Sequence, residues 1–274
     1  KSNIITNEFM GKKEFKFLHN YHSHTIYCYH AVNTVQDVIL MAIKNGWKTI
    51  GISEHAPLNT HRKFRLNWDT IDDYIQEVSF YKRKYKDQIT VLCGLEAEYD
   101  GSQYEYYKKL RDKKGIDYMI LGNHNIGNPS DCKVWNVNNP DLFQYYKQYE
   151  EAAKSGLFAY CAHPDIIYRY YLKWDADAIK IAKKIIATSI KYDFPLGFNI
   201  NGLRMKLVDF DYPTDMFWEL VAKSKAKVII ETDAHDPYTM SQEMVDKGVA
   251  LVKQWGLEKN LINKLTLQSK HLKK

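Results

Sequence analysis

Seven of the ten histidines in this chain, together with two carboxylates, stand in short polar motifs: His22, His24, His30, His55, His124, His163 and His235, with Glu96 and Asp233. The first motif contains His22-x-His24, and the last contains Asp233-x-His235. On an extended segment, residues i and i+2 point to the same side, so each pair can hold one metal ion. Imidazole and carboxylate ligands suit Zn, Mn, Fe and related ions, and few thiolates argue against a structural zinc finger.

The elements that position these motifs can be read from hydrophobic periodicity. Short apolar runs alternate with longer amphipathic stretches, which predicts about seven βα units in series. The predicted strands are 15–18, 49–52, 89–93, 118–121, 158–161, 196–200 and 228–230, and the predicted helices are 34–45, 69–85, 103–111, 141–154, 176–192, 214–223 and 239–255. Serial βα units imply a parallel sheet, either doubly wound or closed into a barrel. No glycine-rich fingerprint follows the first strand, which disfavours a Rossmann nucleotide site.

Six of the seven predicted strands are followed by a histidine, aspartate or glutamate of the set above. In parallel α/β folds the carboxyl ends of the strands share one face, and in barrels that face holds the active site. Taken singly, each residue has a simpler interpretation, such as a helix cap or a hydrogen-bonded loop residue. Taken together, they predict one pocket that binds metal.

Composition and charge limit the domain number, the kind of substrate and the cellular compartment that the chain is expected to have. With 274 residues, 45% of them apolar, the chain fits one domain over 1–274. The net charge of +6 is spread along the chain, which favours a small anionic substrate over nucleic acid. Four cysteines without framework spacing indicate reduced thiols and a cytoplasmic protein. We expect no membrane span, since no apolar run approaches 18 residues, and no signal peptide in the first fifteen residues. Cys28 is interpreted as a small buried side chain rather than a ligand.

The motifs "HSHTIYCYH", "ISEHAPL", "GLEAEY", "LGNH", "CAHPDI" and "ETDAHDP" resemble those of the PHP (polymerase and histidinol phosphatase) family, and within it the histidinol-phosphate phosphatases. The resemblance covers essentially the whole chain and fills every metal-ligand position of the family in order. It implies an α/β fold, a distorted (β/α)7 TIM-like barrel, with a trinuclear centre of divalent Zn, Mn or Fe ions.

The resemblance also implies a ligand set for each ion. The first ion would be held by His22, His24, Glu96 and Asp233. The second would be held by Glu96, His124 and His163, with Glu96 as the bridge. The third would be held by His30, His55 and His235.

Several further residues are expected to act around this centre. Arg169 and Arg204 resemble phosphate-contacting arginines of the phosphatases, and His61 lies in a loop that could contact substrate. Glu54 and Asp165 neighbour ligands and could orient imidazoles. Two positions depart from the family pattern: Gly122-Asn123-His124 replaces a Gly-Ser-Val-His motif, and glycine stands at 197, where an acidic residue is expected on the sixth strand.

The predicted function is therefore a metal-dependent phosphomonoesterase, a cytoplasmic enzyme of histidine biosynthesis that hydrolyses L-histidinol phosphate. Its expected catalytic residues are His22, His24, Glu96, Asp233 and His235. Phosphate monoesters hydrolyse very slowly, and divalent ions can lower the pKa of a bound water and neutralise phosphate oxygens. The alternatives are a PHP phosphoesterase acting on another small phosphate ester or a nucleotide diester, an amidohydrolase-type C–N hydrolase, and a non-catalytic metal-binding protein. The native metal, the general acid and the oligomeric state are left open.

Overall fold

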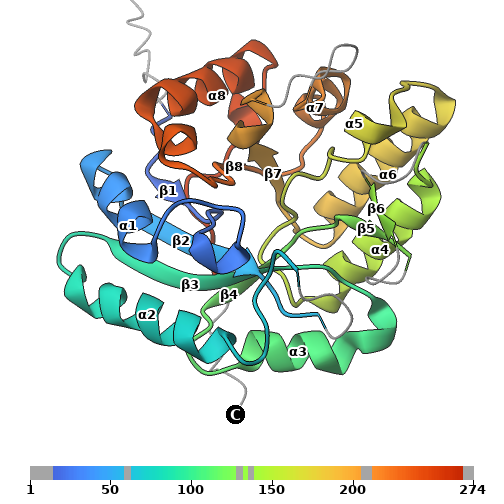
Figure 1. The fold of residues 1–274 in the computed structure, drawn as a ribbon. Helices are drawn as coiled ribbons and strands as arrows, with labels where there is room; N and C mark the ends of the chain where they lie inside the picture. Colours follow the sequence, from blue (N-terminus) through green and yellow to red (C-terminus); the bar gives the residue numbers. More distant parts are fainter. Residues whose placement is uncertain (1–14, 59–62, 128–131, 135–138, 205–211, 268–274) are drawn as a thin grey trace, which may run out of the picture.

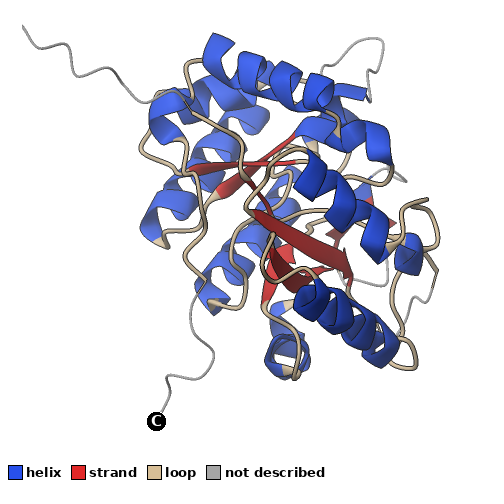
Figure 2. Cartoon of the chain, turned by 90° about the vertical axis from the view of Figure 1, so that its left-hand side faces the viewer, coloured by secondary structure: helices blue, strands red, loops and turns tan. Residues whose placement is uncertain are grey.

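A curled sheet of parallel strands lies at the centre of the molecule, and helices surround it (Figure 1). The computed structural model describes residues 15–58, 63–127, 132–134, 139–204 and 212–267. In the view turned by 90°, the strands again lie inside and the helices outside (Figure 2). The sequence therefore predicted the α/β class and the parallel sheet correctly.

The strands pair in the order in which they occur in the chain. One sheet has the order β1 (His19–Asn20), β2 (Thr49–His55), β3 (Thr90–Ala97) and β4 (Tyr118–Leu121), all parallel. A second parallel pair joins β7 (Leu196–Asn199) to β8 (Val228–Glu231). Isolated parallel bridges connect the two groups, since Cys161 bridges both Leu121 and Leu196, and Ser23 bridges Ala234.

Amphipathic helices cover the outer face of these strands. They are α1 (Val35–Lys44), α2 (Ile71–Lys84), α3 (Tyr104–Asp112), α4 (Leu142–Ser155), α5 (Tyr168–Tyr171), α6 (Ala176–Lys191), α7 (Asp215–Ala222) and α8 (Gln242–Gln254). Local signals set their ends. A capping box between Thr34 and Asp37 begins α1, and Gly46, at φ +72°, follows its end. Asp141 caps α4, which ends at Gly156 with φ +67°.

Two predicted strands differ from the structure. The first lies at His19–Asn20 rather than at 15–18. The run 158–161 forms no strand. It joins the sheet through the isolated bridges of Cys161. Backbone hydrogen bonds from Leu121 to Tyr160 and from Cys161 to Pro195 still tie it to both neighbours. The chain then turns sharply at His163, where φ is +33°, so the ladder stays too short for a strand. A short antiparallel pair, β5 (Asn125–Ile126) and β6 (Cys132–Lys133), and helix α5 were not expected.

The apolar residues form two cores. The larger core lies between the strands and the helices. The smaller one fills the space inside the curled sheet and consists of Tyr21, Tyr118, Ile120, Tyr160, Ala162, Ile229 and Leu265. Its members alternate along the chain, as expected for side chains that share one face of a strand.

The inner core depends on one tyrosine and two glycines. The Tyr118 hydroxyl donates a hydrogen bond of 2.5 Å to the carbonyl of Tyr21. A Cβ at Gly51 would overlap the Tyr118 hydroxyl, and a Cβ at Gly94 would overlap its ring. The two glycines therefore make room for a large side chain that fills the interior of the sheet.

None of the helices in the described part of the chain is long and apolar enough to cross a membrane.

We expect Gly51→Ala to lower the free energy of unfolding by about 1–3 kcal/mol, because its Cβ would meet the Tyr118 hydroxyl. Adding Tyr118→Phe removes that hydroxyl, so the double variant should be more stable than the sum of the single changes predicts. Denaturant unfolding of the four proteins gives the coupling. Gly94→Ala serves as the control, because its Cβ would meet ring carbons that phenylalanine retains. Additive effects of Gly51→Ala and Tyr118→Phe would contradict this account.

Candidate metal centre

The segment after β1 delivers the first two imidazoles. Ser23 bridges Ala234, and its hydroxyl donates to the carbonyl of Gly51 at 2.7 Å, which holds the segment extended between its neighbours. His22 and His24 therefore point to the same side, as their spacing predicts. Both side chains are fully buried, and their Nε2 atoms lie 3.0 Å apart.

Glu96, near the end of β3, lies at the centre of the site. Its carboxylate oxygens are 2.8 Å from His163 Nε2 and 3.0 Å from His55 Nδ1. They are 3.3 Å from the Nε2 atoms of both His22 and His24, and 3.4 Å from that of His124. Five imidazoles from four parts of the chain thus surround one buried carboxylate.

Asp233 approaches the same imidazoles from the turn after β8. Its Oδ1 lies 3.3 Å from the Nε2 atoms of His22 and His24, and its Oδ2 accepts a hydrogen bond from Asn199. Asp233 has φ +47°, in the left-handed region that costs free energy for a residue with a Cβ. Together with the positive φ of His163, this places backbone strain at the two turns that present ligands, as is common at functional sites.

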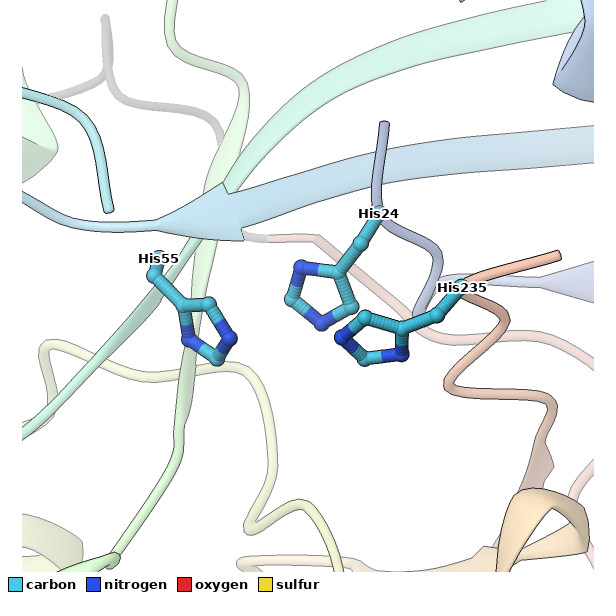
Figure 3. Close-up of side chains that lie close together, drawn as sticks. All are labelled: His24, His55 and His235. Carbon is cyan, nitrogen blue, oxygen red and sulfur yellow. The ribbon is translucent and has the colours of Figure 1, made fainter. Parts of the chain in front are cut away.

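A second group of imidazoles lies beside the first. Ligand atoms of His24, His55 and His235 lie within 4.8 Å of one another. Figure 3 shows the three rings close together, with those of His24 and His235 stacked at 4.3 Å between centroids. His30, which is exposed, lies 4.6 Å from His235 by the same measure. The structure thus brings all nine predicted ligands into one region.

The donors fit a cluster of divalent cations. Nε2 of His22 and Nε2 of His24 face each other across 3.0 Å, and both face oxygens of Glu96 and Asp233. Buried Glu96 Oε2 and His235 Nε2 have no hydrogen-bond partner in the described part of the chain. Buried polar atoms are normally satisfied, and nitrogen and oxygen donors that converge in this way suit Zn, Mn or Fe.

The electrostatics also favour cation binding. Burial lowers the pKa of His22, but the carboxylates of Asp233, Glu231 and Glu96 outweigh this effect and raise it to about 10. Burial raises the pKa of Glu96, and the surrounding imidazoles bring it well below its usual range. Burial lowers the pKa of His235 to about 3, so this ring is neutral at neutral pH. A metal would therefore meet ionised carboxylates and some neutral rings, and would displace protons from others.

Buried carboxylates stand behind three of the imidazoles. Glu231 accepts a hydrogen bond from His22 Nδ1 at 2.9 Å, and Glu98 accepts one from His124 Nδ1 at 2.9 Å. Glu54 lies 3.6 Å from His24 Nδ1 and accepts from Thr25. Such partners fix which ring nitrogen carries the proton. Glu54 was expected from its place beside His55, whereas Glu98 and Glu231 were missed, although each lies two residues from a candidate ligand.

The expectation that Asp165 orients an imidazole was wrong. Its carboxylate accepts hydrogen bonds from the backbone of Thr214 at 2.7 Å and from the indole of Trp218 at 3.1 Å. Asp165 therefore anchors the start of α7 behind the site. It lies two residues after His163, but its hydrogen bonds go to Thr214 and Trp218 instead of to a ligand ring.

A cavity of about 470 Å³ opens beside the imidazoles. Its other walls include Ile166, Arg169, Tyr170, Arg204 and Tyr212. The two predicted substrate arginines therefore line it, Arg169 packed over the ring of Tyr170 and Arg204 paired with Asp236. His61, the third predicted contact, lies outside the described residues.

Comparisons with known proteins identify the family that the sequence motifs resemble. The family model of the PHP domain matches residues 20–201. The chain is 28% identical over 260 residues to a probable histidinol-phosphatase of Schizosaccharomyces pombe, covering 82% of this chain and 85% of the relative. It is 32% identical over 254 residues to a probable phosphatase of Clostridium acetobutylicum, covering 90% of each.

Among solved structures, the fold is similar to that of histidinol phosphate phosphatase from Lactococcus lactis, crystallised with Zn, L-histidinol and phosphate. The TM-score is 0.70 at 17% identity, and the match covers 91% of this chain and 99% of the other. At this identity the likeness concerns the fold.

The buried carboxyl group of Asp165 makes the free energy of unfolding depend on pH. Burial raises its pKa from 3.8 to about 6, so the folded chain holds this proton more tightly than the unfolded chain. The resulting stability is present below pH 4 and is lost as the pH rises through 6. Relative to Asp165→Asn, the wild-type free energy of unfolding should fall by about 2 kcal/mol between pH 4 and 7. Denaturant unfolding of both proteins with a chelator measures this; a difference that is constant with pH would contradict it.

Proposed function

Since the chain belongs to the PHP family, we propose that it is a metal-dependent phosphomonoesterase that hydrolyses L-histidinol phosphate to L-histidinol and phosphate. The observation that carries the proposal is the convergence of seven imidazoles and two carboxylates in one region beside the cavity, with Glu96 in contact with five of the rings. The names of relatives aligned over most of the chain point to the same substrate.

We propose that residues 1–274 form one domain, a distorted barrel of seven βα units. The bridges of Cys161 to both neighbouring strands support a fifth unit, and the bridge between Ser23 and Ala234 supports closure of the ring of strands. In such a barrel all ligand-bearing turns lie at the same end.

Three divalent ions, Zn, Mn or Fe, would occupy the site. His22, His24, Glu96 and Asp233 would hold the first, Glu96, His124 and His163 the second, and His30, His55 and His235 the third. The contacts of Glu96 with rings of all three sets support its place between them. When bound, such ions supply an activated water and positive charge for the phosphate oxygens.

The chain's own side chains would bind and orient the substrate. Arg169 and Arg204 lie in the wall of the cavity and offer planar donors for phosphate oxygens. Arg204 is held by Asp236 and by a 2.8 Å hydrogen bond to Thr239, so it is ordered before substrate arrives. Tyr170 and Tyr212 add aromatic surface beside the arginines, which suits the imidazole ring of histidinol. His61 remains a proposed contact.

The catalytic residues in this proposal are His22, His24, Glu96, Asp233 and His235. Their fixed positions would orient the phosphate for in-line attack, with His22 held by Glu231 and Asp233 held by Asn199. The enzyme would act in the cytoplasm on a small phosphorylated substrate of histidine biosynthesis, with neither membrane nor nucleic acid as a partner.

A panel of phosphate-release assays on the metal-loaded protein tests the function. We expect turnover of L-histidinol phosphate above that of other monoesters, little turnover of a nucleotide diester or an amide, and loss of activity with a chelator. His22→Ala should lower the rate more than about 100-fold, because the first ion loses a buried ligand.

His19→Ala is the matched control, because His19 precedes the ligand segment and bonds to Thr49 instead; it should keep the wild-type rate. Circular dichroism checks that both variants fold. The proposal fails if the loaded protein turns over no monoester, or if His22→Ala retains the wild-type rate.

A further inference from the structure

Glu231, the last residue of β8, lies fully buried behind the ligands. Its Oε2 accepts hydrogen bonds from His22 Nδ1 at 2.9 Å and from the Tyr160 hydroxyl at 2.6 Å. Its Oε1 accepts one from the backbone N–H of His163 at 2.9 Å. One carboxylate thus holds the ring of one candidate ligand and the main chain of another, where that chain has positive φ.

The neighbouring strand leaves space for this carboxylate. Gly197 on β7 has no side chain, and a Cβ there would lie 2.7 Å from Glu231 Oε1, 2.8 Å from its carboxyl carbon and 2.9 Å from the backbone oxygen of Cys161. Real Cβ atoms do not approach other atoms this closely, so any other residue at 197 would displace the carboxylate. The glycine and the glutamate are therefore a matched pair on adjacent strands.

All three partners of Glu231 are donors, so an acid group is required. A glutamine would have one accepting oxygen and one donating amide nitrogen. If the amide nitrogen faced the His163 N–H, two donors would oppose each other in a buried space. If it faced His22, the ring proton would have to move to Nε2, the atom that points to Glu96 and Asp233.

We propose that Glu231 is the positioning residue of the metal centre: it keeps the proton of His22 on Nδ1, so that Nε2 is free for a metal, and it fixes the turn that presents His163. The proposal rests on the metal centre proposed above. His22 and His163 belong to the proposed sets of two different ions, so Glu231 ties the two sites together from behind. Gly197 is required because it provides the space.

The first experiment measures metal affinity without turnover. The full-length protein is stripped with a chelator and titrated with Zn²⁺ in competition with a chromogenic chelator. Glu231→Gln should weaken the tightest Zn²⁺ binding about 10–100-fold, the range for lost partners of metal-ligating histidines. Glu243→Gln is the matched control, because this exposed glutamate pairs with Lys247 and Tyr238 at the surface; the Zn²⁺ affinity of this variant should equal that of the wild type.

The second readout follows the His22 proton directly. In ¹⁵N-histidine spectra of the Zn²⁺-loaded protein, His22 should show a protonated Nδ1 and an unprotonated Nε2, assigned by its absence in His22→Ala. Glu231→Gln should lose or shift the Nδ1–H signal. A residue that only supported the fold would change stability and leave this signal in place.

The third experiment moves the carboxylate to the adjacent strand. A carbon–carbon bond is about 1.5 Å long, so an aspartate at 197 would place its carboxyl group close to where that of Glu231 now lies. The double variant Gly197→Asp/Glu231→Gly should bind Zn²⁺ much more tightly than Gly197→Ala/Glu231→Gly, which carries the same Cβ beside the backbone oxygen of Cys161 but no carboxylate. It also keeps the test decisive if Glu231→Gln does not fold.

The outcomes separate this proposal from the function on which it rests. Wild-type Zn²⁺ affinity and an unchanged His22 signal in Glu231→Gln would overturn the positioning role, while the metal centre would stand. A folded Gly197→Asp/Glu231→Gly variant that binds Zn²⁺ no more tightly than Gly197→Ala/Glu231→Gly would also overturn it. If the wild-type protein bound no Zn²⁺, the metal centre itself and this proposal would both fail.

Discussion

A buried carboxylate within reach of five imidazoles sets the requirements for the rest of this structure. Glu96 is only 2% exposed, and ionised groups removed from water are costly unless they are paired. Its partners come from the turns after β1 and β4, from the last residue of β2 and from the turn at His163, so the strands must run parallel and end at the same level. The curled sheet therefore serves the site by placing these turns around one point. The room for Glu96 also depends on Gly122, where a Cβ would lie 2.6 Å from Cγ of Glu96 and closer still to its carboxylate oxygen Oε1.

Concentrating so many titratable groups creates a second requirement, because each imidazole must be held in one orientation. This requirement is met by three buried carboxylates that contact the imidazoles behind the candidate ligand atoms, those of Glu231, Glu98 and Glu54. The inner core closes the other end of the sheet, with Tyr118 and Tyr160 filling the interior and Tyr160 bonded to Glu231. The hydrogen bond from Tyr160 to Glu231 therefore connects the inner core to the candidate metal centre.

The sequence predicted the features that follow from periodicity and from strand ends. The helices, the parallel order and the convergence of nine polar residues could be read from the alternation of apolar runs and from the motifs that follow them. The strand at 158–161 could not be placed, because an apolar run does not reveal that the turn at His163 shortens the ladder. Glu98 and Glu231 were missed since a glutamate in or beside a strand gives no sign of which side chain it contacts. Asp165 was misjudged because closeness in sequence to His163 does not fix direction. The glycine at 197, which departs from the family pattern, becomes intelligible only when Glu231 is seen to occupy the space beside it.

The central claim is that the donors around Glu96 form a centre for several metal ions. Elemental analysis of the purified full-length protein, after loading with divalent metal and removal of the excess, tests this most directly. The ligand sets proposed for this chain predict about three ions per chain, and His22→Ala should contain fewer. One ion or none in the wild-type protein would contradict the account.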